Sequence, residues 1–330
     1  MIFKGALAPF FMQFRTELKY PKSKWDIDYK SKIISVGSCF STNIAERMSE
    51  LQFDIVNNPY GTFYNPISIF KALNYTELDF ENTYIEREGQ WMSLLSHSDT
   101  SANDKESLIT LLKERLKLFN QKIKSADYLL LTLGSAKIYK YKKTDLIVAN
   151  CHKVSQNEFE SRILTVEEIT QDFRSIHSRL RKINPNVKII ITVSPVRYLA
   201  DGFEQNSISK AMLIAAVHEI LKEFENVEYF PAYELVLDDL RDYRFYNEDL
   251  IHPNSIAVKY VFQKFKESYF NESTKQLALK VYKINKALNH IPFNRESNSY
   301  KKFLDDLKVK IDEMSNYIDT TRFKERLAKK

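Results

Sequence analysis

Cysteine and glycine are scarce in this sequence, and each scarcity argues against a class of protein. Its 330 residues include two cysteines, Cys39 and Cys151, which are too few for a secreted disulfide scaffold or for a multi-cysteine zinc or iron–sulfur cluster. The six glycines form no phosphate-binding loop, and the six histidines are scattered along the chain. We therefore expect no metal, no cofactor and a reducing, cytoplasmic location.

Long apolar runs are also missing. No stretch approaches the roughly 20 apolar residues that cross a bilayer, so we expect no membrane span. An apolar patch at residues 5–12, with Lys4 before it, is too short for a signal peptide, and Met12 is an alternative start.

The net charge of +6 is concentrated in the tail of the chain. Residues 275–330 hold 14 lysines or arginines and 7 acidic residues, a local charge of +7. The preceding residues are about neutral, so we expect no nucleic-acid partner. The 44% of hydrophobic residues and 13% of aromatics are ample for a large core, in one large domain or two ordinary ones.

Five β-rich apolar runs alternate with stretches of helical spacing. The continuous apolar run at 127–134 is typical of a strand buried on both faces of a parallel sheet. The alternation predicts a doubly wound, three-layer α/β/α fold with a mainly parallel five-stranded sheet. The expected strands lie at 33–36, 53–56, 127–134, 187–193 and 227–230, and the expected helices at 41–51, 66–73, 108–123, 166–183, 209–224 and 255–270.

Two stretches interrupt this alternation. Residues 74–104 have no clean period, and we interpret them as an irregular insertion that includes a β-hairpin. The insertion at 137–157 contains a second predicted hairpin, which brings Asn150, Cys151 and His152 beside the end of a sheet strand.

The tail at 275–330 predicts a helical hairpin appended to a main domain of residues 1–274. Its two apolar stripes must bury against each other, against the body or against a second copy of the chain, which would make a homo-oligomer. The stripes are Leu277, Val281, Ile284 and Leu288, then Tyr300, Leu304, Leu307, Ile311, Met314 and Ile318.

The turn after the first predicted strand carries the clearest functional pattern. Apolar residues 33–36 lead into Gly37-Ser38-Cys39, and helical spacing follows from Ser41. Such a strand–turn–helix presents a side chain at the carboxyl edge of the sheet, where the helix amino end favours a thiolate or an oxyanion. The alternative is a tight turn with a serine N-cap and a small buried cysteine.

A nucleophile needs a base, and Asp249 with His252 has a suitable spacing. Residues three apart can face one side of a turn, and this turn would lie at the same sheet edge as Cys39. The alternative is a helix cap with an exposed histidine before Pro253.

Several separated motifs occur in a fixed order along the chain. They are Gly37-Ser38-Cys39-Phe40 with Asn43, Asn58-Pro59-Tyr60-Gly61-Thr62, Leu131-Thr132-Leu133-Gly134, Asn150-Cys151-His152-Lys153, Ser194-Pro195-Val196-Arg197, and Asp249 with His252-Pro253. In this order they resemble the GSCFA domain, a branch of the SGNH/GDSL hydrolase superfamily. The resemblance covers roughly residues 14–265, and the tail is similar to the family's carboxyl extension.

The resemblance implies which residues act. The superfamily's nucleophilic serine falls on Cys39, while Ser38 stands where the superfamily has Asp and is the alternative nucleophile. Gly61 is similar to the glycine whose backbone N–H is an oxyanion donor, and Asp249 with His252 matches the Asp-x-x-His block.

One block departs from the superfamily pattern, because Gly134 is followed by Ser135 and Ala136 where a side-chain oxyanion donor is expected. Ser135 stays a candidate for binding substrate. We hypothesise that Asn150 replaces the donor from the hairpin, with His152 nearby.

For two further residues the sequence allows both a functional and a structural role. His97 either lines the pocket or is structural. Arg197 either binds a substrate carboxylate or phosphate, or forms an exposed salt bridge.

The resemblance implies a hydrolase that acts on ester bonds, an esterase or deacetylase of a small-molecule acyl ester such as an O-acylated carbohydrate. An acyltransferase would use the same residues. A third alternative is a binding or redox protein in which Cys39 and Cys151 form a reversible disulfide.

Overall fold

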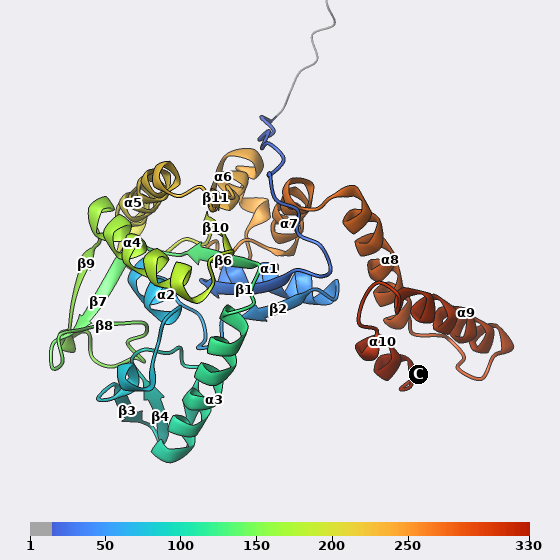
Figure 1. The fold of residues 1–330 in the computed structure, drawn as a ribbon, viewed down its shortest axis with the longest axis horizontal. Coiled ribbons are helices and arrows are strands. Elements are labelled where there is room, and N and C mark those ends of the chain that lie inside the picture. The colour runs from blue at the N-terminus through green and yellow to red at the C-terminus, as the bar shows by residue number, and fades with distance from the viewer. Residues whose placement is uncertain (1–14) are drawn as a thin grey trace, which may run out of the picture.

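The computed structural model describes residues 15–330, so the apolar patch at 5–12 and the alternative start at Met12 lie outside the described residues. A central sheet of five parallel strands organises the described part of the chain (Figure 1). Its spatial order is β11 (Val227–Tyr229), β10 (Lys188–Val193), β6 (Tyr128–Leu133), β1 (Lys32–Gly37) and β2 (Asp54–Asn57).

The strand order reverses direction beside β1. The chain runs from β1 outward to β2, then returns to the other side of β1 and continues through β6, β10 and β11. Ligands bind at such a reversal in open α/β sheets, in the crevice beyond the carboxyl ends of the strands. In this fold that crevice lies beyond β1 and β6, whose ends are Gly37 and Leu133.

Both faces of the sheet are buried, because successive side chains of a strand point to opposite faces. Ile34 and Leu131 pack in the core under α2 (Pro66–Ala72), α4 (Val166–Ile183) and α5 (Gly202–Glu223). Ile33 and Leu130 pack in the core under α1 (Cys39–Glu50) and α7 (Ser255–Tyr269). The predicted three-layer α/β/α fold with a five-stranded sheet is confirmed.

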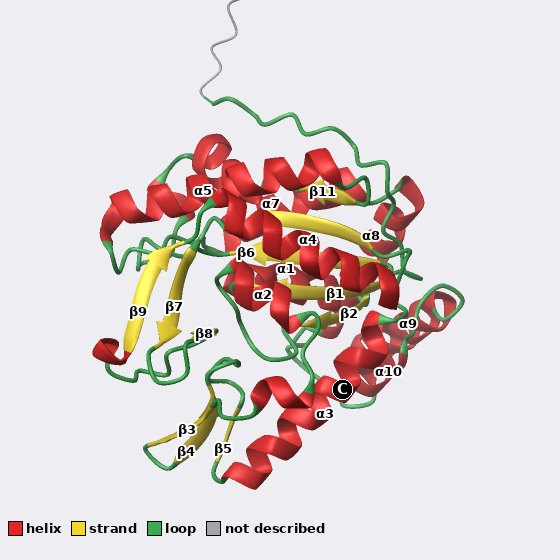
Figure 2. Ribbon diagram, turned by 60° about the vertical axis from the view of Figure 1, so that its left-hand side comes forward, coloured by secondary structure: helices red, strands yellow, loops and turns green. Residues whose placement is uncertain are grey.

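The two insertions form small sheets apart from the central one (Figure 2). The predicted hairpin in 74–104 is confirmed as β3 (Tyr84–Arg87) and β4 (Gln90–Ser93), joined by β5 (Ser101–Ala102) and preceded by the 3-10 turn η1 (Glu77–Phe80). The helix α3 (Lys105–Ile123) follows.

The hairpin predicted in 137–157 is also confirmed. It consists of β7 (Lys137–Tyr141) and β8 (Leu146–Val148), and after the 3-10 turn η2 (Gln156–Glu158) the strand β9 (Phe159–Ile163) pairs with the other edge of β7.

The largest error in a predicted helix boundary is at the start of α5. The predicted helix begins at Ser209, but α5 begins at Gly202. Its first turns are exposed, with Phe203 62% accessible, so they carry no apolar period by which a sequence pattern could detect them. Between β11 and α7 the chain forms α6 (Ala232–Glu234), the π-helical segment η3 (Leu235–Leu240) and the 3-10 turn η4 (Tyr243–Phe245).

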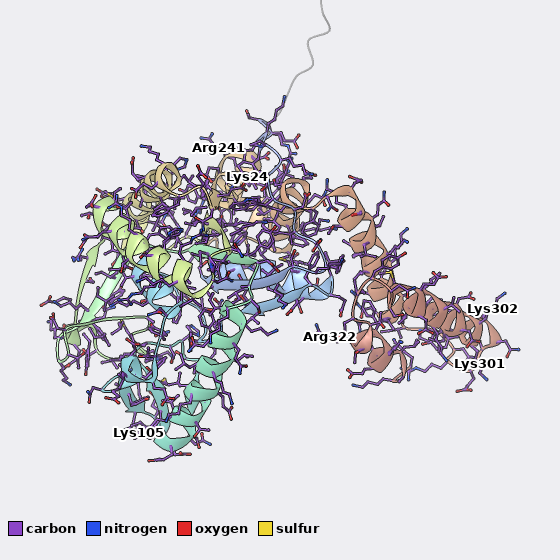
Figure 3. All side chains as sticks on the ribbon, viewed as in Figure 1. Lys24, Lys105, Arg241, Lys301, Lys302 and Arg322 are labelled. Atoms are coloured by element: carbon purple, nitrogen blue, oxygen red, sulfur yellow. The ribbon has the colours of Figure 1, made fainter. Side chains whose placement is uncertain are left out.

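The tail forms α8 (Glu272–Leu288), α9 (Asn298–Met314) and a short unpredicted helix, α10 (Thr321–Leu327). The basic residues Lys301, Lys302 and Arg322 lie on the exposed part of this appendage (Figure 3). Its buried apolar residues join the core of the α1 face, among them Val281, Ile284, Leu288, Leu307, Ile311 and Met314. The predicted helical hairpin is therefore confirmed, whereas its independence as a domain and its role in a homo-oligomer stay predictions.

No helix within residues 15–330 has the length and apolar character that crossing a bilayer requires.

Candidate active site

The turn after β1 is built around a residue that must be glycine. Gly37 has a φ of +148°, and a Cβ on it would lie 2.2 Å from the carbonyl oxygen of Thr132 on β6. Asn58, which directly follows β2, stabilises the same turn, because its Oδ1 accepts from the Gly37 N–H at 2.8 Å and its Nδ2 donates to Ser41 Oγ at 3.1 Å. Ser38 N–H donates to Thr132 at 3.0 Å, which leaves Cys39 as the first residue of α1.

Cys39 lies on a cavity of about 400 Å³ at the carboxyl edge of the sheet. The cavity is lined by Ser38, Cys39, Tyr64, Gly134, Ser135, Ser194, Val196, Arg197, Tyr198, Leu199, Ala200, Ile251 and His252. Cys39 is half-buried, whereas Ser38 is 1% exposed and its hydroxyl has no hydrogen-bond partner among the described residues. Access therefore favours the Cys39 thiol over the Ser38 hydroxyl as nucleophile.

Burial raises the pKa of the Cys39 thiol above its ordinary value. The backbone N–H groups of Phe40 and Cys39, together with the positive charge of Lys210, act in the opposite direction, and the Asp249 carboxylate adds to the increase. The helix amino end thus favours a thiolate as expected, but desolvation outweighs it.

The Asp249–His252 pair forms as predicted from its spacing. His252 Nδ1 lies 2.7 Å from Asp249 Oδ2, and Asp249 Oδ1 accepts from the backbone N–H groups of Ile251 and His252 at 2.9 and 3.0 Å. These hydrogen bonds, that from the His252 backbone first, lower the pKa of Asp249 to about 2. Because an ionised carboxylate only accepts, His252 donates from Nδ1, and neutral His252 keeps Nε2 as an acceptor for another proton.

Arg197 supports the loop that carries His252. Its backbone N–H donates to Ile251 O at 3.3 Å, and its guanidinium donates to Leu250 O at 3.2 Å and lies 4.3 Å from the ring centroid of Tyr246. Arg197 also lines the Cys39 cavity, so the predicted binding of a substrate anion stays a prediction alongside this structural role.

Gly61 and His97 do not line the Cys39 cavity. A Cβ on Gly61 would lie 2.3 Å from His97 Cβ, so the glycine is needed for close packing. The Gly61 N–H already donates to Asn58 O at 2.8 Å, and His97 Nδ1 pairs with Asp99 at 2.9 Å. An oxyanion role for Gly61 stays a prediction that would require its present hydrogen bond to break.

Asn150 and His152 lie together in the second insertion, away from Cys39. Asn150 lines an adjoining cavity of about 560 Å³, and its Oδ1 accepts from the His152 N–H at 2.8 Å. His152 is 4% exposed, and its ring contacts Ser93 O at 2.7 Å and Ser98 Oγ at 3.3 Å. Burial lowers the pKa of His152, which favours its neutral form. Neither residue lines the cavity that contains Cys39.

Ser135 connects the two cavities, because it lines both, as do Tyr64 and Tyr198. Its hydroxyl lies 3.1 Å from Ser209 Oγ and accepts from the Lys137 N–H at 3.1 Å. Its role in substrate binding stays a prediction.

The two cysteines are both free thiols and line different cavities. Burial raises the pKa of Cys151 to about 11, so its thiol stays protonated at neutral pH. Within residues 15–330, no three His, Cys, Asp or Glu side chains gather as a metal site.

Sequence reasoning missed Lys210, which is buried directly behind the site. Its ammonium donates to Gly134 O and Ser194 O, two residues that line the Cys39 cavity. A detectable signal existed, because Lys210 continues the apolar stripe of Leu213, Val217 and Ile220 along α5.

The fold and the site define an α/β protein with a cysteine, a histidine and a carboxylate at the carboxyl edge of its sheet. The GSCFA family model matches residues 32–265, and the model for the C-terminal domain of GSCFA domain proteins matches residues 281–329. The chain therefore belongs to the GSCFA family, as its motifs suggested. No curated protein matches it.

Three solved structures are distantly similar. A carbohydrate esterase family 3 protein from Talaromyces cellulolyticus and a mutant acetyl esterase with acetate ion each match at 10% identity and a TM-score of 0.35, over 76% of this chain and 98% and 99% of theirs. The acetyl xylan esterase Est2A from Butyrivibrio proteoclasticus matches at 11% identity and a TM-score of 0.36, over 72% of this chain and 63% of its own.

Proposed function

We propose that this protein hydrolyses ester bonds, with Cys39 as nucleophile, His252 as general base and Asp249 as the residue that orients His252. The observation that carries the proposal is that one cavity is lined by the half-buried thiol and by a histidine whose Nδ1 is bound to a carboxylate at 2.7 Å. A nucleophile, a base and an orienting acid are the parts that acyl transfer requires.

The chemistry begins with proton transfer from the thiol to His252 Nε2. The thiolate then attacks the acyl carbon, and the tetrahedral intermediate collapses to a thioester while the His252 imidazolium gives its proton to the leaving alkoxide. Water, deprotonated by His252, attacks the thioester and releases the acid with a free thiol. Asp249 stays ionised and stabilises each imidazolium, as its pKa of about 2 supports.

The oxyanion would be stabilised at the amino end of α1. The first N–H groups of a helix have no intrahelical partner, and those of Cys39 and Phe40 face the thiol. The Ser38 hydroxyl is buried on the same cavity without a partner among residues 15–330, so it is a suitable third donor. Each such donor is typically worth about 100- to 1,000-fold in rate.

The adjoining cavity of about 560 Å³ suits the alcohol part of the ester. Aromatic side chains line it together with amides, and the two cavities share Tyr64, Ser135 and Tyr198. Aromatic faces with nearby polar groups complement a sugar ring that has both C–H and O–H groups. We infer an O-acylated carbohydrate with a small acyl group such as acetyl. The lining aromatics are Tyr64, Tyr139, Phe159 and Tyr198, and the amides are Asn65, Asn150 and Gln156.

The test is intact-protein mass after brief exposure to p-nitrophenyl acetate at neutral pH. Wild type should take an acetyl adduct that Cys39→Ala abolishes and Ser38→Ala does not, and His252→Ala should prevent its turnover. An adduct that depends on Ser38 would move the nucleophile by one residue. No adduct with any activated acyl donor would overturn the proposal.

Hydrolase and acyltransferase use the same acyl-enzyme and differ in the acceptor. Adding glycerol or a monosaccharide to the assay separates them, because a transferase gives an ester of the added alcohol in place of free acetate.

A further inference from the structure

The loop at residues 150–153 carries one of the chain's motifs, and the proposed chemistry does not use it. The loop contains a tight turn in which the Val154 N–H donates to Cys151 O at 2.9 Å. Both central residues of this turn have a positive φ, 49° at His152 and 57° at Lys153. Glycine, asparagine and aspartate dominate such positions, because other side chains strain a left-handed backbone. The contacts around the turn must therefore offset the strain of two successive residues.

Contacts on both sides of His152 hold this turn in place. Asn150 Oδ1 accepts from the His152 N–H at 2.8 Å, and Arg87 donates to His152 O at 3.4 Å. The His152 ring contacts Ser93 O at 2.7 Å. The next residue, Lys153, lines the cavity of about 560 Å³. Strained backbone that is held by its surroundings is concentrated at ligand-binding and active sites, so the placement of Lys153 indicates a function.

Lys153 differs from the other lysines of the 137–157 insertion, because its ammonium has no ion pair or hydrogen bond within residues 15–330. The other four each bind an oxygen of the protein. They are Lys137 with Asp201 at 2.6 Å, Lys140 with Asp145 at 2.6 Å, Lys142 with the carbonyl oxygen of Asn157 at 2.8 Å and Lys143 with Glu158 at 3.1 Å. An exposed lysine is ordinarily only solvated, so the charges of the surrounding cavity decide whether it binds a ligand.

The lining of the cavity favours an anion. Its charged residues are Lys137 and Lys153, and no aspartate or glutamate of the described residues lines it. Lys137 is already paired with Asp201, which lines a third, smaller cavity. The connected Cys39 cavity contains Arg197 and likewise has no lining carboxylate from residues 15–330. A cleft lined by one sign of charge attracts the opposite sign, and Lys153 is the cation available to pair with it.

We propose that the alcohol part of the ester carries an anionic group, a carboxylate or a phosphate, and that Lys153 binds this group. The substrate is then an O-acylated anionic sugar whose acyl group reaches Cys39 through the connection between the two cavities. A lysine ammonium is a compact point charge with three donors, so it suits either oxyanion. This substrate class rests on the proposed function, which assigns the cavity of about 560 Å³ to the alcohol part.

The first experiment measures the binding of three sugars without an acyl group by ligand-observed NMR: glucose, glucuronate and glucose 6-phosphate. At least one of the two anionic sugars should bind about fivefold more tightly than glucose, as expected for one ion pair at a partly exposed site. Added salt should reduce this preference, because it screens the charge. The tighter anionic sugar identifies the group as carboxylate or phosphate. Equal affinities for the three sugars, or binding of none of them, would overturn the proposal.

Variants of Lys153 test whether this residue causes the preference. Lys153→Asn removes the charge, and asparagine tolerates a left-handed backbone, so the turn should keep its shape. This variant should bind the anionic sugars no more tightly than glucose, whereas Lys153→Arg should retain the preference. The matched control is Lys182→Asn, which removes an exposed lysine from the last turn of α4 and should bind as wild type does. A preference that persists in Lys153→Asn would contradict the assignment.

These outcomes are independent of ester hydrolysis, because none of the three sugars is an ester. A preference for anionic sugars that depends on Lys153, in a protein that takes no acyl adduct, would retain the anion site and reject the esterase. An acyl adduct on Cys39 in a protein without this preference would retain the esterase and reject the anion site.

Discussion

The protein has two regions with the same kinds of reactive side chain, and they differ in what surrounds them. At the sheet edge, His252 is 44% exposed and binds a carboxylate with one ring nitrogen while Cys39 lines the same cavity. In the second insertion, His152 is buried, and both of its ring nitrogens contact oxygens of the first insertion. In the first region, hydrogen-bonding groups remain free to bind a substrate. In the second region, the same kinds of group form hydrogen bonds that join two segments of the chain.

The cysteines make the same contrast. Burial raises the pKa of both thiols, but at Cys39 the backbone N–H groups of the helix amino end act against the increase, whereas the pKa of Cys151 is raised to about 11. Residue type is therefore a weak indicator of function in this fold. Whether the polar groups of a residue already have hydrogen-bond partners within the protein is a stronger indicator.

The largest expected effect separates the two cysteines. Cys39→Ala should lower kcat for p-nitrophenyl acetate by about 1,000-fold or more, since removing a nucleophile leaves only binding and oxyanion stabilisation. Cys151→Ala should retain acyl-enzyme formation, measured as the acetyl adduct by intact mass. Equal losses in the two variants would remove the contrast between the two regions.

Alanine substitution of the two histidines should affect different properties of the protein, activity in one case and stability in the other. His252→Ala should lower kcat by about 1,000-fold, because the base for both steps is gone, with little change in stability. His152→Ala leaves the Ser93 carbonyl buried without its donor and should reduce the free energy of unfolding by about 1–3 kcal/mol. Urea denaturation followed by circular dichroism, beside the esterase assay, measures both. A stable but inactive His152→Ala would contradict the structural role.

A smaller effect is expected on the free energy of unfolding when alanine replaces either of two glycines with positive φ. An alanine at Gly37 would meet Thr132 O at 2.2 Å, whereas Gly89 in the β3–β4 turn has nothing within 4 Å. Both substitutions strain the backbone, but Gly37→Ala adds a backbone clash and should cost more than about 2 kcal/mol against about 1 kcal/mol for Gly89→Ala. Denaturant midpoints of the two variants test this, and equal costs would show that the turn before Cys39 adapts to the added methyl group.

The smallest effect is a pH dependence at Asp249. Its pKa in the folded state is about 2, below the ordinary 3.8, so its stabilising hydrogen bonds are complete above pH 4. They are lost as the pH falls through about 2, because the carboxylate is then protonated. Thermal melts between pH 5 and 2 should show a shallower loss of stability in Asp249→Asn than in wild type. Parallel curves would indicate that Asp249 does not interact with His252 in solution.

Local patterns predicted the fold well wherever one segment carries its own signals. The helix Val166–Ile183 was predicted at its observed bounds, because Thr165 and Glu168 form a capping box and the apolar period is regular. The start of α5 was missed because its first turns are exposed and have no apolar period. Cys39, Asp249 and His252 could be singled out as candidates because a turn or a three-residue spacing places them.

Residues whose role depends on a distant partner were harder to predict. Asn150 was expected near the oxyanion, but its side chain caps its own loop in the adjoining cavity. The N–H of Gly61 is already donated within its turn. Lys210 was not predicted as a site residue, because its ammonium binds two carbonyl groups that are 76 and 16 residues away in sequence.

The amino-acid sequence by itself determined the alternation of strands and helices, the glycine of the turn before Cys39 and the local pair of Asp249 and His252. These depend on periodicity, backbone conformation and neighbours within a few residues. Only the tertiary structure decided which polar groups are left open, which cavity each cysteine lines and where a buried positive charge lies. Burial and long-range hydrogen bonds set those properties, and they exist only once segments distant in sequence have packed together.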